Sequence, residues 1–277
     1  MWWQTRRFRL DLSRPLVMGI VNVTPDSFSD GGLHASPEAA CQHCEQLLNE
    51  GADILDIGGE STRPGAHTPS VAEELARVLP VVQHAVTLRV PVSVDTSRAE
   101  VISAVLDAGA DIINDVRALQ SPGSLQAVTR YTGVGVCLMH MQGDPHSMQQ
   151  APHYDDVVAE VQQFLAQRLA AVTQAGVPED CITLDPGYGF GKTAAHNVAL
   201  LQGQAALSAL GRPLLIGWSR KRTLGEITGK PVHERVAASV AAALAAVSRG
   251  AHIVRVHDVA ATVDALKVWA AAGLVTR

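Results

Sequence analysis

The chain consists of short apolar runs that alternate with longer amphipathic stretches. Three of the runs resemble one another, because each follows a small Gly-Ala turn and ends in polar residues: EGADILDIGGE (50–60), AGADIINDVR (108–117) and GAHIVRVHD (250–258). The segments before them have helical spacing. A helix that ends at glycine and leads into a strand buried on both faces is typical of a parallel sheet.

The same pattern over the whole chain predicts eight strands and the helices between them. The strands are residues 15–22, 52–58, 91–95, 110–115, 134–140, 181–185, 213–219 and 251–257. Ser36-Pro37-Glu38 predicts the start of the first helix, and Ser70 with Glu73 predicts a capping box for the second. The later helices are expected at residues 98–108, 122–131, 155–175, 197–210, 233–249 and 259–271.

Eight strand-helix units in 277 residues predict an α/β fold, a single (β/α)8 TIM barrel with long loops after strands 1 and 2. A doubly wound open sheet is the alternative, since the same alternation builds both folds. We assign residues 1–14 to an N-terminal extension over the bottom of the barrel and residues 15–277 to the barrel. The long loops, 22–36 and 58–70, are candidate lids over the carboxyl ends of the strands.

Composition excludes several classes of protein. A net charge of −5 argues against a nucleic-acid-binding protein held by a basic surface. No apolar run approaches the length of a membrane span, and the N-terminus lacks the apolar core of a signal peptide, so we expect a cytoplasmic protein. Cys41 and Cys44 form a C-x-x-C, but they lie inside a predicted helix without further ligands for zinc. Two cysteines one turn apart on a helix are the simpler interpretation.

Polar residues stand at or just after the ends of the eight predicted strands. They are Asn22, Glu60, Asp95, Asn114 with Asp115, His140, Asp185, Ser219, and Arg255 with His257. In a barrel these ends form the active-site face. Strands three, four and six supply acceptors and an amide, which suit a flat heterocycle rich in N–H groups. Strands seven and eight supply the cations of 219–222 with Arg255 and His257, which suit phosphate.

The stretch DPGYGFGKT (185–193) ends like a P-loop but does not complete the motif. A P-loop needs a glycine at position 186, where this chain has Pro186, and a dinucleotide fingerprint needs a third glycine at the position of Lys192. An NTPase is therefore disfavoured. The glycines instead indicate a backbone that approaches a ligand closely, with Asp185 at the root of the loop.

Eight motifs in order resemble one known family. They are MGIVNVTPDSFSDGG (18–32), DIGGESTRPGA (56–66), SVDTS (93–97), INDVR (113–117), LMHMQG (138–143), DPGYGFGK (185–192), GWSRK (217–221) and IVRVHDV (253–259). These are similar to the successive signatures of dihydropteroate synthases, transferases of bacterial folate synthesis. The resemblance implies a (β/α)8 barrel, usually a homodimer, that uses Mg²⁺. It also implies two small-molecule substrates, 6-hydroxymethyl-7,8-dihydropterin diphosphate and 4-aminobenzoate, which the enzyme condenses to 7,8-dihydropteroate and diphosphate.

The resemblance also assigns residues to each part of the site. It places the pterin diphosphate on Thr62, Asp95, Asn114, Asp185, Lys221, Arg255 and His257. It places 4-aminobenzoate against Phe28, Arg63, Pro64, Phe190 and Arg222. The metal contact is Asn22, and the residues expected to carry catalysis are Asp95, Lys221, Arg255 and His257. We expect a dissociative displacement, because the dihydropterin ring can stabilise a cation at its exocyclic methylene while the cationic side chains stabilise the departing diphosphate.

Two departures and two rival functions accompany this assignment. Trp218 stands where smaller residues or Met are common in the family, so the packing near Lys221 is expected to differ. Arg222 stands where Ser is common, so the affinity for 4-aminobenzoate and its sulfonamide analogues is expected to differ. A pterin-dependent methyltransferase shares the barrel but needs no cations for a diphosphate. A non-catalytic pterin-binding homologue would be expected to lack one or more strand-end residues, and none is lost here.

Overall fold

The computed structural model describes residues 1–24, 37–61, 68–144 and 148–274. Eight parallel strands form one sheet in the order β8-β7-β6-β5-β4-β3-β10-β9. They are β3 (Leu16–Asn22), β4 (Ile54–Gly58), β5 (Val92–Asp95), β6 (Ile112–Asp115), β7 (Gly135–Met139), β8 (Ile182–Asp185), β9 (Leu215–Ile216) and β10 (Ile253–Val256). A parallel bridge between Leu184 and Leu214 joins the two edges of the sheet. The predicted TIM barrel is therefore confirmed.

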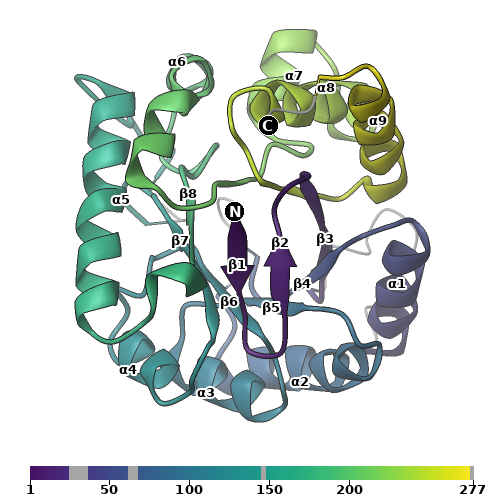
Figure 1. The fold of residues 1–277 in the computed structure, drawn as a ribbon, viewed down its shortest axis with the longest axis vertical. Coiled ribbons are helices and arrows are strands. Elements are labelled where there is room, and N and C mark those ends of the chain that lie inside the picture. Colours follow the sequence, from purple (N-terminus) through teal and green to yellow (C-terminus); the bar gives the residue numbers. More distant parts are fainter. Residues whose placement is uncertain (25–36, 62–67, 145–147, 275–277) are drawn as a thin grey trace.

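The helices form a ring around this sheet (Figure 1). They are α1 (Pro37–Asn49), α2 (Val71–Thr87), α3 (Ala99–Asp107), α4 (Ser124–Thr129), α5 (Val157–Gln174), α6 (Ala194–Gln202), α7 (Arg222–Thr228), α8 (Val236–Val247) and α9 (Val259–Ala271). Short 3-10 helices are η2 (Glu179–Cys181), η3 (Gln204–Leu210) and η4 (Val232–Glu234). The main core lies between the helices and the outer face of the strands, where Val, Leu, Ile and Ala predominate.

Local signals in the sequence account for several helix boundaries. Ser70 caps α2 as predicted: its hydroxyl accepts from the backbone N–H of Glu73 at 3.2 Å, and the Glu73 carboxylate accepts from the backbone N–H of Ser70 at 2.7 Å. Gly51 and Gly109 follow α1 and α3 with φ of +99° and +103°, a conformation that favours glycine. These glycines turn the chain from a helix into the next strand, as the repeated Gly-Ala pattern predicts.

The structure differs from the predicted elements mainly between residues 193 and 230. Helix α6 begins at Ala194, earlier than predicted, because Thr193 caps it in a capping box with His196. The predicted strand 213–219 is reduced to Leu215–Ile216, and helix α7, which was not predicted, begins soon after it. The backbone turns between these two elements at Arg220, whose φ is +57°.

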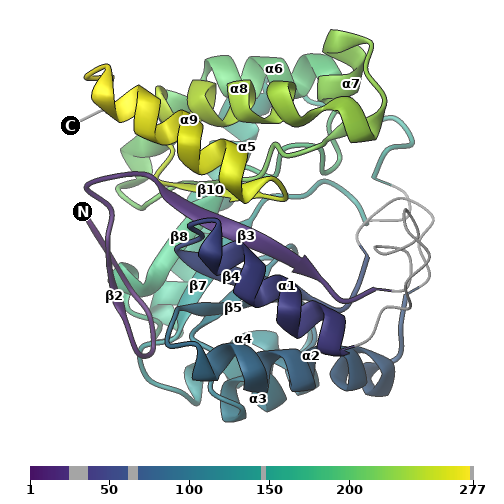
Figure 2. The ribbon, with the colours of Figure 1, turned by 90° about the vertical axis from the view of Figure 1, so that its right-hand side faces the viewer.

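The first residues form a hairpin that covers the amino-terminal end of the barrel. Strands β1 (Trp2–Gln4) and β2 (Arg9–Asp11) pair antiparallel, and Trp3 is fully buried with its Nε1 donating to the carbonyl of Cys181 at 2.9 Å. Trp3 packs in a second core with Leu12, Leu16, Met18, Ile54, Ile112, Cys137, Leu215 and Ile253. Figure 2 shows the hairpin at one end of the barrel, with strand β3 pointing away from it. The carboxyl ends of the strands therefore lie at the opposite end.

Candidate active site

Arg255 on β10 bonds directly to residues of two other strands at the carboxyl end of the barrel, and a third strand joins through Asp56. Its Nε donates to Oδ2 of Asp56 on β4 at 2.6 Å, and its Nη2 donates to Oδ2 of Asp95 on β5 at 2.9 Å. Asn114 on β6 donates from Nδ2 to the same Asp56 oxygen at 3.2 Å. Three of the predicted residues are thus brought into one network, with Asp56 at its centre.

Burial governs the charges in this network. It raises the pKa of Asp95 to about 7, while the nearby guanidinium of Arg255 opposes that rise. Burial also acts to lower the pKa of Arg255, but Asp56 and Asp95 outweigh it and the pKa is raised, so the guanidinium stays charged. Among the described residues, no partner binds the buried Oδ1 of Asp56. The network therefore holds the charged guanidinium between the carboxyl groups of Asp56 and Asp95, which are largely removed from water.

Asp56 is the residue of this network that strand-end reasoning missed. It lies inside β4, paired with Ile20 and Ser93 of the neighbouring strands, and is 0% exposed. The signal in the sequence was a single carboxylate within an otherwise apolar strand, ILDIG. Glu60, the residue singled out at the end of this strand, instead lies 3.8 Å from the guanidinium of Arg98.

A second group of predicted residues surrounds the glycine-rich loop after β8. Oδ1 of Asp185 accepts from the backbone N–H of Gly187 at 2.7 Å. The Lys221 ammonium donates to the carbonyl of Tyr188 and lies 4.6 Å from the centre of the Phe190 ring. Asp185, Lys221 and Phe190 therefore share one corner of the rim, where a flat ring would find a carboxylate, a cation and an aromatic face.

The charges at this corner are also shifted by burial. Burial lowers the pKa of Lys221 to about 8, and the Asp185 carboxylate opposes that shift. Burial raises the pKa of Asp185, and Lys221 opposes that rise. Each charge thus offsets part of the effect of burial on the pKa of the other group. A ligand that pairs with Asp185 would meet a carboxyl group already partly removed from water.

The predicted cation run 219–222 is divided among different partners. The Ser219 hydroxyl lies 3.0 Å from Nδ1 of His257 and orients that ring. Arg220 forms a bidentate pair with Asp258, with its Nη2 2.5 Å from Oδ1. Arg222 is 84% exposed, and its Nε donates to Glu226 at 2.7 Å. Lys221 is the member of this run that faces Asp185, and a contact of Arg222 with 4-aminobenzoate stays a prediction.

Two other polar strand ends have structural partners. Asp115 is buried and accepts from Ser97 at 2.5 Å and from the backbone N–H groups of Arg117 and Leu119 at 2.8 and 2.9 Å. These bonds stabilise a turn in which Leu119 has φ of +56°. His140 is buried too, and its ring lies edge-on to Phe164 with centroids 4.9 Å apart. Neither side chain joins the Arg255 network.

Asn22, the predicted metal contact, ends β3 on the same rim. The strand register places it beside Gly58, which in turn lies beside Asp95. Within the described part of the chain, no group of three His, Cys, Asp or Glu side chains could hold a metal ion. An amide oxygen alone does not make a metal site, but Mg²⁺ commonly takes few protein ligands and completes its shell with phosphate oxygens and water. Asn22 therefore fits a metal that arrives with a diphosphate.

The remaining predicted residues belong to two loops near the carboxyl ends of β3 and β4 in the sequence. Phe28, Thr62, Arg63 and Pro64 lie in segments 25–36 and 62–67, outside the described residues. The same holds for most of the long loop after the first strand and part of the loop after the second. Their roles toward the diphosphate and 4-aminobenzoate stay predictions.

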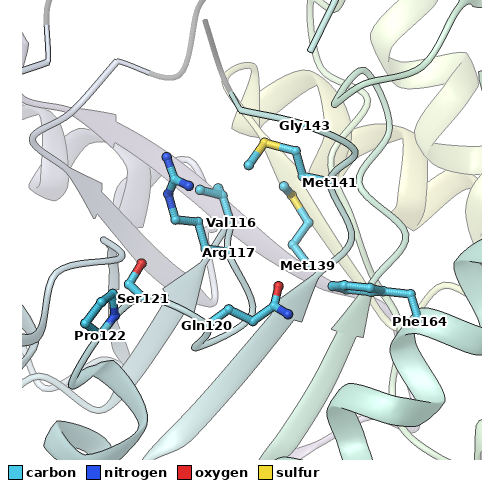
Figure 3. A pocket seen from close by; sticks show the side chains of 9 residues that line it. All are labelled: Val116, Arg117, Gln120, Ser121, Pro122, Met139, Met141, Gly143 and Phe164. Carbon is cyan, nitrogen blue, oxygen red and sulfur yellow. The ribbon is translucent and has the colours of Figure 1, made fainter. Parts of the chain in front are cut away.

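A cavity of about 230 Å³ opens beside the site, between the carboxyl ends of β6 and β7. Figure 3 shows its lining residues, which are Val116, Arg117, Gln120, Ser121, Pro122, Met139, Met141, Gly143 and Phe164. An ion pair of 2.9 Å joins Arg117 to Asp144. Met139 lines the cavity and also packs against the glycine-rich loop. A Cβ atom added to Gly187 would lie 3.3 Å from the Cγ of Met139. The cavity thus lies next to the corner of Asp185, Lys221 and Phe190, and none of these three residues lines it.

A closed barrel whose carboxyl-end rim joins carboxyl groups, an amide and cations from several strands has the architecture of a TIM-barrel enzyme. Residues 18–257 match the family described as Pterin binding enzyme. The dihydropteroate synthase of Neisseria meningitidis serogroup B is 54% identical over 278 residues, covering 98% of each chain. The chain therefore belongs to the pterin binding enzyme family, and within it to the dihydropteroate synthases.

Solved structures agree in fold over the full length. The dihydropteroate synthase of Yersinia pestis in complex with a sulfonamide drug superposes with a TM-score of 0.93 at 49% identity, covering 99% of both chains. The enzyme of Xanthomonas albilineans with 4-aminobenzoic acid superposes with a TM-score of 0.92 at 54% identity, covering 100% of both chains. Among the described residues, no helix is both long and apolar enough to span a membrane.

Proposed function

We propose that this chain condenses 6-hydroxymethyl-7,8-dihydropterin diphosphate with 4-aminobenzoate to form 7,8-dihydropteroate and diphosphate. The observation that carries the proposal is the Arg255 guanidinium, held at 2.6 and 2.9 Å from Asp56 and Asp95 on the active-site rim. The family membership supports the same reaction. So does the Xanthomonas albilineans relative, which binds 4-aminobenzoic acid.

The pterin ring would bind between the two groups of rim residues. Its aminopyrimidine edge carries N–H donors, and the carboxylate of Asp185 can accept two of them in a charge-assisted contact. Asp95 and Asn114 would bind the remaining polar edge, because Asp95 ends β5 and Asn114 is the last residue but one of the neighbouring strand β6. Lys221, beside Asp185, would bind a ring acceptor and lie over Phe190. These contacts orient the ring without changing it.

The reaction then breaks the bond between the exocyclic methylene carbon and the diphosphate oxygen. The electron pair leaves with the diphosphate, and Arg255 and His257 stabilise its charge. The ring donates electron density to the methylene carbon, so the positive charge is spread over the dihydropterin. The amine of 4-aminobenzoate attacks that carbon and afterwards loses a proton. The weakly basic amine needs no dedicated general base, and we name none among the described residues.

We propose Mg²⁺ as the metal of this site, with the amide oxygen of Asn22 as its contact on the protein. When bound with the substrate, Mg²⁺ would neutralise charge on the diphosphate. Asn22→Ala is expected to raise the Mg²⁺ concentration for half-maximal activity several-fold, with little change in the dissociation constant for the pterin alcohol. Equal half-saturation in the wild type and the variant would remove Asn22 from the metal site.

We propose that the chain forms a homodimer through α7, η4 and α8. Ile227, Val232 and Val236 are 61%, 47% and 36% exposed on these consecutive elements. Exposed apolar residues that cluster on one surface are typical of an interface. Light scattering should report a dimer for the wild type and a monomer for Ile227→Asp. We also propose a cytoplasmic location, where the four free cysteines would stay reduced.

Replacement of Arg255 tests the proposed reaction. Arg255→Ala should reduce dihydropteroate formation by about 100- to 1000-fold, a loss comparable to removing one strong stabiliser of a developing anion. Arg14→Ala is the matched control, because Arg14 pairs with Asp53 at the opposite end of the barrel. Full activity of Arg255→Ala would contradict the proposal that its guanidinium stabilises the leaving group.

A further inference from the structure

Lys192 is a lysine of the glycine-rich stretch that is almost fully buried. Its side chain is 3% exposed, and its Nζ lies 2.9 Å from Nδ1 of His140, 3.0 Å from the carbonyl of Gly187 and 3.1 Å from the carbonyl of Phe190. The nitrogen thus has one protein partner in each of three directions, and burial lowers the pKa of Lys192 well below its ordinary value. These three partners occupy the directions in which the lysine nitrogen could otherwise bind a phosphate.

The loop beside Lys192 carries residues of the rim corner that Asp185, Lys221 and Phe190 share. Asp185 accepts from Gly187 at its root, and Phe190 lies beneath the Lys221 ammonium at its tip. The loop packs closely against the chain after β7: a Cβ at Gly187 would overlap the carbonyl oxygen of His140. Because the loop is packed this closely, its carbonyl groups must find hydrogen-bond donors within the protein, and these bonds help to fix the shape of the loop.

Those carbonyl groups need donors, because a buried carbonyl without a partner is unfavourable. Lys192 supplies a donor to the carbonyl of Phe190, and a further donor to the carbonyl of Gly187, which also accepts from the backbone N–H of Phe190 at 3.1 Å. The Tyr154 hydroxyl supplies a further one, to the carbonyl of Gly191 at 2.8 Å. Lys192 therefore connects the loop to β7 through His140 and spans the segment between Asp185 and Phe190.

We propose that Lys192 is a positioning residue for the pterin ring: it holds loop 187–191 in the shape that presents Asp185 and Phe190, and it does not contact the diphosphate. The proposal rests on the proposed function for the identity of the ligand. It assigns a role to the lysine that makes this stretch resemble a P-loop, and the role is opposite to the one that a P-loop lysine has.

Two ligands distinguish positioning from phosphate binding. The dissociation constants of the pterin alcohol, 6-hydroxymethyl-7,8-dihydropterin, and of its diphosphate are measured by calorimetry for the wild type, Lys192→Met and Lys267→Met. Lys267 is the matched control, an exposed lysine on α9 that lies 3.6 Å from Asp264. Positioning predicts that Lys192→Met weakens both ligands by the same factor, about 10-fold or more. It also predicts a raised KM for the pterin substrate with a smaller change in kcat.

Other outcomes overturn the proposal. A loss confined to the diphosphate would show that Lys192 contacts phosphate, and unchanged binding of both ligands by a folded variant would show that the loop holds its shape without Lys192. If Lys192→Met does not fold, Tyr154→Phe removes another bond to the same loop and should weaken both ligands equally, about 3-fold. Equal affinities of Tyr154→Phe and the wild type would then overturn it.

The proposed function can fail separately from this inference. If the wild type binds the pterin alcohol but forms no dihydropteroate, the synthase reaction is wrong, while the comparison of ligand affinities still tests Lys192. If the reaction proceeds and Lys192→Met weakens only the diphosphate, the synthase assignment stands and the positioning role is wrong.

Discussion

The Nε of Arg255 donates to Oδ2 of Asp56 at 2.6 Å, although 199 positions separate the two residues in sequence. This pair spans the barrel rim from β10 to β4, and Asp56 is 0% exposed. The carboxylate therefore does two things at once: it orients the guanidinium toward the site, and it compensates a charge that is largely removed from water.

Asp56→Asn should reduce both activity and stability. The amide keeps the shape but removes the charge that balances Arg255, and breaking a buried ion pair costs roughly 3 kcal/mol of unfolding free energy. We expect kcat/KM to fall about 100-fold, as for the loss of one oriented electrostatic contact. Urea denaturation and steady-state kinetics measure the two effects. Asp264→Asn is the control, because Asp264 is 78% exposed and pairs only loosely with Lys267. Wild-type kinetics in Asp56→Asn would remove Asp56 from the site.

Substitutions of Arg222 and Glu226 should change the affinity for 4-aminobenzoate in opposite directions. In the structure Arg222 donates to Glu226 at 2.7 Å. Exposed ion pairs are weak, about 0.2–1 kcal/mol, so a change at either residue should alter affinity only about 2- to 5-fold. Arg222→Ser should raise the KM for 4-aminobenzoate and the inhibition constant of a sulfonamide, because the attraction to the carboxylate or sulfonyl group is lost. Glu226→Gln should lower both, because it releases Arg222. If both constants stay unchanged in both variants, Arg222 lies outside the 4-aminobenzoate site.

Lys221 should set the alkaline limit of activity. Burial lowers its pKa to about 8, so the ammonium is present below that pH and is lost as the pH rises through it. The value of kcat/KM for the pterin substrate should therefore decline above about pH 8, since this quantity reports the free enzyme. Lys221→Arg keeps the charge throughout the range, so its weaker activity should show no decline there. The same decline in Lys221→Arg would assign the alkaline limit to another group.

His140 should make the protein sensitive to acid. Its pKa is lowered to about 3, first by burial and then by the nearby Lys192 ammonium. The folded state therefore holds the ring neutral. Above the unfolded-state pKa of about 6.5, the ring is neutral in both states and no unfolding free energy is lost. As the pH falls from there toward about 3, the unfolded state binds a proton that the folded state excludes, so the unfolding free energy decreases. Below pH 6.5 the unfolding free energy should fall by up to ~1.4 kcal/mol per pH unit more steeply in the wild type than in His140→Asn. His153→Asn, at an 84% exposed residue, should match the wild type.

The sequence allowed the fold to be predicted because the signals are local and repeated. Each strand is a short apolar run, and a turn such as Gly51 needs a positive φ that glycine adopts readily. The missed helix α7 follows a two-residue strand, and no side-chain hydrogen bond caps its first turn. Both β9 and α7 are too short to show a clear hydrophobic periodicity, so the bounds of the strand and the presence of the helix could not be predicted.

The site was predictable to the extent that its residues end strands. Asp95, Asn114, Asp185 and Arg255 all do so or nearly do so, and the barrel brings such positions together. Asp56 was missed because it lies within its strand, and its importance follows from the register that places β4 next to β5. The pairing of Arg220 with Asp258 was also not predictable, because it depends on the turn at Arg220.

The most direct test of the account measures diphosphate and dihydropteroate in the same reaction, with the pterin diphosphate, 4-aminobenzoate and Mg²⁺. The account predicts one dihydropteroate for each diphosphate released, with the rate of both lost in Arg255→Ala. Binding of the pterin without release of diphosphate, or release without dihydropteroate, would contradict the central claim that this barrel is a working dihydropteroate synthase.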